Sequence, residues 1–199
     1  ITMLLEKIEK KDTILYQDEE INMKAPFKKI KYLDSLNTIG GIDISIIKDK
    51  TALIKHLKDN DFSVNEKLSL GHIQAEAFDA FVEDKLRNPT FITDFPVEIS
   101  PLARKNDEDK SLVDRFELFV AGKEIANGFN ELNDPLDQYE RFKGQLDAKE
   151  LGDGEAHDMD NDYVKALGFG MPPTAGEGIG IDRLVMLLTD THSIRDVLL

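Results

Sequence analysis

The sequence predicts an α+β fold in which helices flank an antiparallel sheet. Apolar residues recur with helical spacing in some segments and with strand spacing in others. The two kinds of segment are interspersed without a regular βαβ rhythm, which disfavours a parallel sheet. The best-defined pair of strands, within residues 114–133, is joined by a tight turn at Ala121-Gly122 and is therefore antiparallel.

The first half of the chain is predicted to alternate between helices and short extended segments. Apolar spacing predicts helices over residues 2–11, 51–58 and 70–86. The longest of these ends at Asn88-Pro89, because proline disfavours helix in the residue before it. Its buried stripe is expected to contain Ile73, Ala77, Phe78, Phe81, Val82 and Leu86. The strands are expected at 13–16 and 21–23, with an extended segment at 26–33, and residues 42–47 are apolar and β-branched.

The second half is expected to begin with a strand at 90–95 and an extended segment at 96–101. After the hairpin, Asp134 followed by Pro135 predicts a helix start, and this helix should run to about residue 148 with Tyr139 and Phe142 on one face. A loop is then predicted at 152–161, followed by a helix at 162–167 that Gly168 ends and a rigid turn at 171–173. The last helix is predicted to start near Gly180, and its inward residues are expected to be Ile181, Leu184, Val185 and Leu188.

Length and composition narrow the class of protein. The 199 residues suffice for one domain with a full core. The absence of cysteine excludes disulfides, zinc–thiolate sites and cysteine nucleophiles. No apolar run approaches the roughly 20 residues that span a bilayer, and no segment has signal-peptide layout. We therefore expect a cytoplasmic protein without a membrane partner.

The net charge of −14 argues against nucleic-acid binding driven by overall charge. It leaves room for a local basic groove, and it suits a site that prefers a cationic ligand. A surface that is acidic only for solubility is an equally good interpretation of the charge taken alone.

The predicted hairpin places two carboxylates close together. A two-residue turn pairs residue 119 with 124 and residue 117 with 126, so Glu117 and Glu124 become diagonal neighbours on one face. Two adjacent carboxylates repel each other and favour a cation between them. Oxygen ligands that leave room for water and phosphate suit Mg²⁺. The alternative is an ordinary solvated hairpin face.

Three further residues of the hairpin can line the same pocket only if the strand is irregular. In a regular strand Asn127, Phe129 and Glu131 lie on the face opposite to Glu124. A bulge between Glu124 and Asn127 would bring them together. An amide, an aromatic wall and a carboxylate would then suit a cationic amino acid with a long aliphatic stem, although spacing alone favours an ordinary amphipathic strand.

A glycine-rich stretch, residues 176–180, precedes the last helix. Glycines let a ligand approach the backbone closely, and a helix start attracts anions. Arg183 lies in the first helical turn, where it can pair with a phosphate or stack on a base. The stretch matches neither the phosphate-binding Walker loop nor the dinucleotide fingerprint. A tight helix entry with Arg183 in a structural salt bridge is an equally good interpretation.

Taken together, these segments resemble the class II lysyl-tRNA synthetases. The resemblance is strong from about Gly71 to the end of the chain and looser before it. The matching segments are residues 89–96, Ser100-Pro-Leu-Ala-Arg104, Arg115-Phe-Glu117, Lys123-Glu-Ile-Ala-Asn-Gly-Phe129, Glu131-Leu-Asn-Asp-Pro135, Pro172-Pro-Thr-Ala-Gly176, Gly178-Ile-Gly-Ile-Asp-Arg183 and residues 194–199.

The resemblance implies a fold and a reaction. The fold is a six- or seven-stranded antiparallel sheet flanked by helices. In the reaction, ATP and lysine form lysyl-adenylate and pyrophosphate, and the lysyl group passes to tRNA(Lys). The family acts as a homodimer, works by positioning and charge stabilisation, and needs no side-chain nucleophile.

The resemblance also assigns site residues. Glu117 and Glu124 match the carboxylates that hold Mg²⁺, and Glu117 also contacts ATP. Gly180 and Arg183 match ATP-binding positions, and Arg183 is the catalytic candidate. The positions that hold the lysine substrate match Asn127, Phe129 and Glu131.

Parts of the family pattern are not found in the sequence. These are the Arg-Asn-Glu segment of the second class II motif, the long dimer helix of the first and the N-terminal anticodon-binding barrel. We therefore expect residues 1–199 to be the C-terminal portion of a class II catalytic domain, with a helical insertion at about 43–88. We also expect this chain alone not to aminoacylate.

Three alternatives stay open. The first is a paralogue that attaches lysine to elongation factor P, although it is more compact over 43–86. The second is an aspartate- or asparagine-type synthetase, which is disfavoured by Glu131. The third is a non-catalytic module derived from a synthetase, which the retained Glu117, Glu124 and Arg183 make less attractive.

Overall fold

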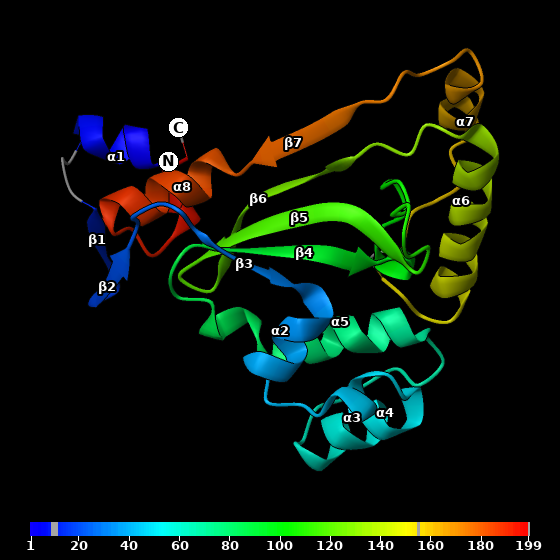
Figure 1. Cartoon of the computed structure of the whole chain (residues 1–199), viewed down its shortest axis with the longest axis horizontal. Coiled ribbons are helices and arrows are strands. Elements are labelled where there is room, and N and C mark those ends of the chain that lie inside the picture. The colour runs from blue at the N-terminus through cyan, green and yellow to red at the C-terminus, as the bar shows by residue number, and fades with distance from the viewer. Residues whose placement is uncertain (9–11, 155, 199) are drawn as a thin grey trace.

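A five-stranded sheet lies at the centre of the computed structural model, which describes residues 1–8, 12–154 and 156–198 (Figure 1). Its strand order is β3 (Lys28–Lys31), β4 (Thr90–Pro96), β5 (Leu112–Val120), β6 (Lys123–Asn130) and β7 (Ala175–Ile179). The four strands β4 to β7 are antiparallel neighbours, as predicted. However, β3 runs parallel to β4, so the prediction of an antiparallel sheet is wrong at this edge. A long helical crossover between the two strands makes the parallel pairing possible.

The crossover between β3 and β4 covers one face of the sheet (Figure 1). Its elements are α2 (Tyr32–Thr38), α3 (Ile44–Ile47), α4 (Lys50–Asp59), α5 (Leu70–Phe81) and the 3-10 turn η1 (Glu83–Lys85). Aromatic rings join this layer to the sheet, since Tyr32 lies 4.8 Å from Phe78 and 4.7 Å from Phe95 between ring centroids. Buried apolar residues of the helices and of β4 and β5 form one continuous core here.

The crossover differs from what local patterns suggest at two points. Residues 42–47 are rich in β-branched residues, but Ile44–Ile47 forms a helical turn, because the Asp43 side chain accepts a hydrogen bond from the Ser45 backbone N–H. This N-cap outweighs the β-branched composition. The helix predicted over 70–86 ends at Phe81, and a 3-10 turn follows it.

A second apolar cluster forms where the N-terminal segment meets the last helix. The hairpin β1 (Thr13–Tyr16) and β2 (Glu19–Asn22) packs with α1 (Thr2–Ile8), α8 (Ile181–Thr189) and the turn end of β5 and β6. The predicted helix over 2–11 is confirmed for residues 2–8, while 9–11 lie outside the described residues.

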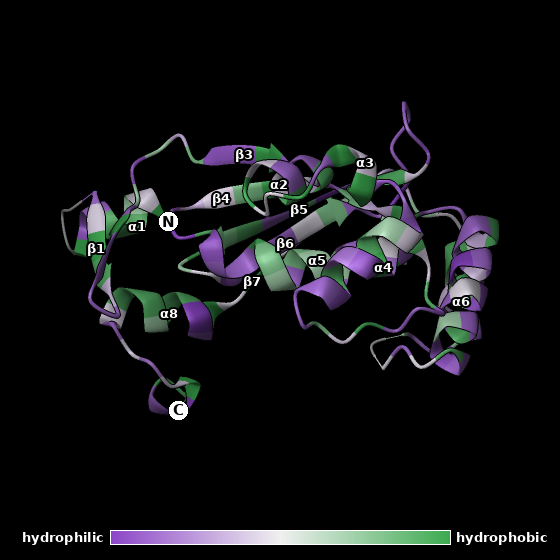
Figure 2. Ribbon diagram, turned by 90° about the horizontal axis from the view of Figure 1, so that it is seen from below, coloured by the Kyte–Doolittle hydropathy of each residue, from purple (hydrophilic) through white to green (hydrophobic). Residues whose placement is uncertain are grey.

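The inward face of α8 differs from the prediction. Although the helix is mostly hydrophobic (Figure 2), Ile181 is 63% exposed and Val185 is 37% exposed. The buried residues of the helix are Leu184, Met186 and Leu187, and Leu188 packs against the cluster in part. The buried face of α8 is therefore centred on Leu184 and Leu187, which belong to the same apolar cluster as the β1–β2 hairpin.

The helix predicted after the hairpin is confirmed as α6 (Pro135–Glu150). The Asp134 side chain caps it by accepting from the backbone N–H groups of Leu136 and Asp137, and Pro135 occupies the first turn. On this helix Phe142 is buried, whereas Tyr139 is 38% exposed, so the two rings do not share a buried face. The helix predicted at 162–167 appears as α7 (Asn161–Leu167).

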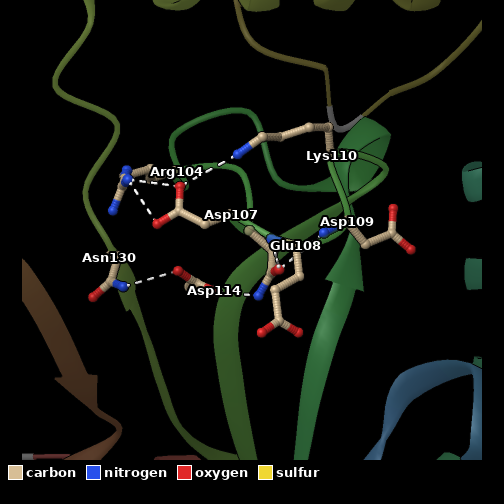
Figure 3. A network of polar contacts seen from close by, with 8 residues as sticks. Arg104, Asp107, Glu108, Asp109, Lys110, Asp114 and Asn130 are labelled. Carbon is tan, nitrogen blue, oxygen red and sulfur yellow. Dashed lines mark hydrogen bonds and ion pairs between the residues drawn. The ribbon is translucent and has the colours of Figure 1, made fainter.

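A polar network ties the beginning of β5 to the end of β6 (Figure 3). The Asp114 carboxylate accepts from Asn106 Nδ2 at 2.7 Å and from Asn130 Nδ2 at 3.1 Å. In the preceding loop, Asp107 pairs with Arg104 and Lys110. Asp114 therefore helps to hold the two strands of the hairpin together at the end away from the turn.

The glycine-rich stretch, residues 176–180, is largely strand β7, which pairs with β6. Close packing explains two of the glycines in these strands, Gly128 and Gly176. A Cβ atom on Gly128 would lie 2.7 Å from the Phe116 ring and 3.0 Å from the Gly176 carbonyl oxygen. A Cβ on Gly176 would collide with the Glu131 carboxylate. A side chain at Gly128 would overlap the Phe116 ring of β5 and crowd the β7 backbone, and one at Gly176 would displace the Glu131 carboxylate.

Two alanine substitutions at glycine should therefore change stability in opposite directions. We expect Gly128→Ala to destabilise the chain by about 1–3 kcal/mol, because the methyl group overlaps the Phe116 ring of β5 and crowds the Gly176 carbonyl of β7. Gly144→Ala is the matched control on exposed α6, where a Cβ meets nothing within 4 Å, and it should stabilise by about 0.5–1 kcal/mol. Urea unfolding of the two variants measures both changes, and a Gly128→Ala protein as stable as wild type would contradict the packing argument.

Candidate active site

The predicted site residues surround two neighbouring cavities on one face of β5 and β6. The larger cavity, about 790 Å³, is lined by Glu117, Glu124, Asn127, Phe129 and Arg183, among others. The second, about 650 Å³, is lined by all of these except Glu117, and also by Glu131 and Gly180. The structure thus brings every predicted site residue to one region. Glu131 and Gly180 do not line the larger cavity.

The bulge that the site requires is present. Phe119 pairs with Glu124, as predicted, and the register then shifts so that Leu118 pairs with Ala126. As a result Glu117 opposes Asn127 and not residue 126, so that detail of the predicted register is wrong. Because directly paired residues share a face, the shift places Glu117, Glu124 and Asn127 on the same side of the sheet.

The turn of the hairpin has the conformation that two-residue connections favour. Ala121 has φ of +55° and Gly122 has φ of +71°. Positive φ at both central residues is typical of a type I′ turn, whose twist matches that of the flanking strands. The turn is also anchored to the crossover, since the Ala121 backbone N–H donates to the Arg87 carbonyl and the Gly122 N–H to the Leu86 carbonyl.

Glu117 is the most strongly perturbed carboxylate of the site. Its side chain is only 12% exposed. Burial raises its pKa from 4.5 to about 7; the Arg115 guanidinium opposes this shift, and the nearby Glu124 carboxylate adds to it. Burial also raises the pKa of Glu83, which faces the same cavity from η1. The lining of this cavity also contains more carboxyl groups than arginine side chains, since Glu117, Glu124 and Glu83 are joined by others and only Arg115 and Arg183 are present.

The raised pKa of Glu117 predicts a pH-dependent stability. A carboxyl that ionises at about pH 7 when folded and 4.5 when unfolded holds its proton more tightly in the folded chain. Without a bound cation, stability should therefore fall as pH rises from 4.5 to 7 and then level off. The loss is about 3 kcal/mol, since one pKa unit corresponds to about 1.4 kcal/mol.

Urea unfolding of wild type and Glu117→Gln at pH 5 and pH 8 measures this effect. The glutamine variant removes the titrating group while keeping its shape, so the difference between the two proteins isolates Glu117. At each pH we compare the free energy of unfolding of the variant with that of wild type. The variant should gain stability over wild type on going from pH 5 to pH 8. An identical pH dependence in both proteins would contradict the assignment.

Arg183 lies three residues after Gly180, the N-cap of α8. Its Nη1 donates to the Glu124 carbonyl at 2.7 Å and lies 3.5 Å from Glu124 Oε2. The side chain is 49% exposed, so it is both paired and open to the cavities. The structural salt bridge and the ligand-binding interpretation are therefore compatible, because an exposed pair of this kind is weak and can rearrange around an anion.

Glu131 lies at the end of β6, in the second cavity. Its backbone N–H donates to the Thr174 carbonyl at 2.9 Å, and burial raises the pKa of its carboxyl. The carboxylate packs against Gly176, whose missing side chain makes room for it. The Glu131 carboxylate thus lies in a recess that Phe129 also lines.

Arg115 is a site residue that the sequence analysis did not single out. It lines the larger cavity and contacts both Glu117 and Asn127. Its position two residues before Glu117 on the same strand was a usable signal, since alternate residues share a face. What the sequence did not reveal was that its guanidinium points at both residues.

The described part of the chain contains no group of three or more His, Asp or Glu side chains arranged to hold a metal ion. Glu117 and Glu124 still offer oxygen ligands of the type that Mg²⁺ prefers, and the excess of carboxyl groups in the lining of their cavity fits a cation. They would need additional oxygens from a ligand or from water. Separately, no helix among the described residues is both long and apolar enough to cross a membrane.

Comparison with known proteins identifies the class. The family model of class II tRNA synthetases (D, K and N) matches residues 1–199, so the chain belongs to this family. Its similar relatives include lysine–tRNA ligases. That of Campylobacter jejuni is 59% identical over 197 residues, covering 99% of this chain. Those of Helicobacter pylori and Wolinella succinogenes are 57% and 56% identical over 196 residues, or 98% of this chain. The chain spans 39% of the length of each of these relatives.

Proposed function

We propose that this chain supplies part of the catalytic site of a lysine–tRNA ligase. The observation that carries the proposal is the β6 bulge, which places Glu117, Glu124 and Asn127 on one face beside Arg183. The names of the relatives support lysine as the amino acid and tRNA as the acceptor. They favour this function over modification of elongation factor P and over an aspartate or asparagine enzyme. The partners we propose are lysine, ATP, tRNA(Lys) and a second copy of the complete enzyme.

The residues divide into two half-sites. For ATP we propose Glu117, Gly180 and Arg183, with Arg183 stabilising negative charge that develops on the phosphates. Glu117 and Glu124 would hold Mg²⁺, which when bound neutralises phosphate charge. Lysine activation then consists of attack by its carboxylate on the α-phosphate, with pyrophosphate leaving. The site promotes this step by orienting the reactants.

For lysine we propose Asn127, Phe129 and Glu131. The Glu131 carboxylate is the group suited to pair with the substrate ammonium, while the Phe129 ring covers the aliphatic stem. An acidic recess rejects aspartate, because like charges repel in a partly buried site. We also propose that residues 43–88 form a helical insertion in the catalytic domain and that the enzyme acts in the cytoplasm.

The test is amino-acid-dependent ATP–pyrophosphate exchange by the complete gene product that contains this chain. We expect exchange with lysine and none with aspartate or asparagine, followed by transfer to tRNA(Lys) and not to elongation factor P. Glu131→Gln should raise the KM for lysine about 10- to 100-fold, the range for losing a hydrogen-bonded charge partner. Exchange with aspartate, or a Glu131→Gln enzyme with unchanged lysine KM, would reject this assignment.

A further inference from the structure

The Arg115 side chain makes more polar contacts than any other side chain that lines the larger cavity in the described part of the chain. Its Nη2 donates to the Glu117 carboxylate, and its Nε donates to Asn127 Oδ1 at 3.1 Å. Its Nη1 donates to the Ile99 carbonyl at 3.0 Å and to Ser100 Oγ at 2.9 Å. All three nitrogens of the guanidinium are therefore engaged at once.

The plane of this guanidinium is held from a further direction. Its central carbon lies 4.6 Å from the centroid of the Phe95 ring, a stacking contact between cation and aromatic face. The side chain is 18% exposed. Because an arginine fork is planar and rigid, fixing the plane also fixes the directions in which its N–H groups point.

The contact with Asn127 determines how that amide is oriented. Arginine carries only donors, so the amide atom that faces it must be the oxygen. The Asn127 Nδ2 group is then turned away from Arg115, and no described residue accepts a hydrogen bond from it. Asn127 lines both cavities, so this N–H₂ group is available to a ligand.

One guanidinium thus contacts a residue of each proposed half-site. Glu117 belongs to the proposed Mg²⁺ and ATP half-site, and Asn127 belongs to the lysine half-site. The Glu117 carboxylate bonds to Nη2 and the Asn127 amide to Nε of one planar, rigid group, so the positions of the two side chains depend on each other. The same link acts in the opposite direction, because coupling between two sites is reciprocal.

We propose that Arg115 is a positioning residue that couples ATP binding to lysine binding by orienting Glu117 and Asn127 together; this rests on the proposed function. Neutralising Glu117 alone would not require arginine, since a lysine ammonium provides the same charge. Bonding to Glu117 and to Asn127 at the same time requires N–H groups that point in two fixed directions, as those of the arginine guanidinium do. Arg115→Lys should therefore keep the charge and lose the coupling.

The experiment measures lysine affinity by calorimetry, with and without Mg²⁺ and a non-hydrolysable ATP analogue, in the complete gene product. In wild type we expect the analogue to tighten lysine binding by roughly 5- to 150-fold, the usual range of coupling between sites. In Arg115→Lys the ratio of the lysine affinity with the analogue to the affinity without it should fall toward one. Arg141→Lys is the matched control, because Arg141 is also buried, donates to the Val97 carbonyl and pairs with Asp137.

The outcomes separate a positioning role from a merely structural one. If Arg115 had only a structural role, Arg115→Lys would lower the lysine affinity equally with and without the analogue. The ratio of the two affinities would then equal that of wild type, and this result would overturn the proposal. An equal fall of the ratio in Arg141→Lys would overturn it too. If Arg115→Lys does not fold, Ser100→Ala removes one anchor of the guanidinium and should lower the ratio to a smaller extent; an unchanged ratio there would count against coupling.

Failure of the proposed function gives a different result. In that case wild type shows no lysine-dependent ATP–pyrophosphate exchange and no lysine binding, and both proposals are rejected. If wild type exchanges with lysine but binds lysine equally with and without the analogue, the ligase assignment stands and only the role of Arg115 is rejected.

Discussion

Replacing Glu117 by glutamine is expected to lower kcat/KM for ATP in lysine activation by about 10²- to 10³-fold, the range for removing one preorganised charge-stabilising group. The Glu117 carboxylate is 12% exposed and shares a face with Glu124. A neutral amide keeps the shape of the side chain and removes the charge that would hold a cation against the phosphates. Lysine-dependent ATP–pyrophosphate exchange by the complete gene product, with Mg²⁺ titrated at each ATP concentration, measures the effect.

Asp114→Asn is the matched control for this substitution. Asp114 lies on the same strand, three residues earlier, and its carboxylate bonds to Asn106 and Asn130 (Figure 3). It lines neither of the two cavities of the site. In Asp114→Asn, the rate of ATP–pyrophosphate exchange should depend on the Mg²⁺ concentration as it does in wild type. If Glu117→Gln also retained this dependence, Glu117 would not be a ligand of the metal or of ATP.

The same Glu117→Gln change is expected to make the cation-free chain more stable at pH 8. Stability and activity then move in opposite directions at one residue, because the site keeps a buried carboxylate that folding alone disfavours. This opposite response is hard to explain if Glu117 is only part of a solvated hairpin face. It is expected if the buried charge is kept for a ligand.

Arg183→Ala should have the second-largest effect, a loss of about 10²-fold in kcat/KM for ATP. The Arg183 guanidinium lies at the start of α8 and faces both cavities. Its partner in the absence of ligand is Glu124, through an exposed pair. Exposed pairs contribute about 0–1 kcal/mol, so the unfolding free energy should hardly change. Calorimetric titration with ATP and Mg²⁺, together with urea unfolding, separates the two effects.

Two further variants sharpen this test. Arg183→Lys keeps the charge and loses the fork, so its activity should lie between those of wild type and Arg183→Ala. Arg195→Ala removes an exposed arginine of the following 3-10 turn, Ile194–Asp196, and should bind ATP as wild type does. A large loss of stability in Arg183→Ala with unchanged ATP affinity would show that Arg183 is only structural.

Local signals in the sequence predicted the parts of the fold that depend on near neighbours. The Ala121-Gly122 turn, the Asp134 cap with Pro135 and the apolar stripe of α5 each depend on residues a few positions apart. The pairing of Phe119 with Glu124 followed from the turn alone, and the need for a bulge before Asn127 followed from strand parity. These features placed Glu117 and Glu124 together before any tertiary contact was considered.

Other features depended on residues far apart in the chain. Residues 176–180 lack the composition of a strand, yet 176–179 belong to β7, because β6 offers a partner whose Gly128 leaves room for the β7 backbone. The run at 42–47 has strand composition, yet the Asp43 cap makes it helical. The parallel pairing of β3 requires the whole crossover, which no local pattern encodes.

The sequence by itself determined the hairpin, its two carboxylates and the helix that presents Arg183, since these depend on local periodicity and turn chemistry. Only the tertiary structure decided that Glu131 occupies a second cavity and that Arg115 joins Glu117 to Asn127. The contacts of Arg115 come from residues 95, 99, 100, 117 and 127. Such a convergence is set by strand pairing and packing across the sheet, because side-chain direction depends on which residues become neighbours after the chain has folded.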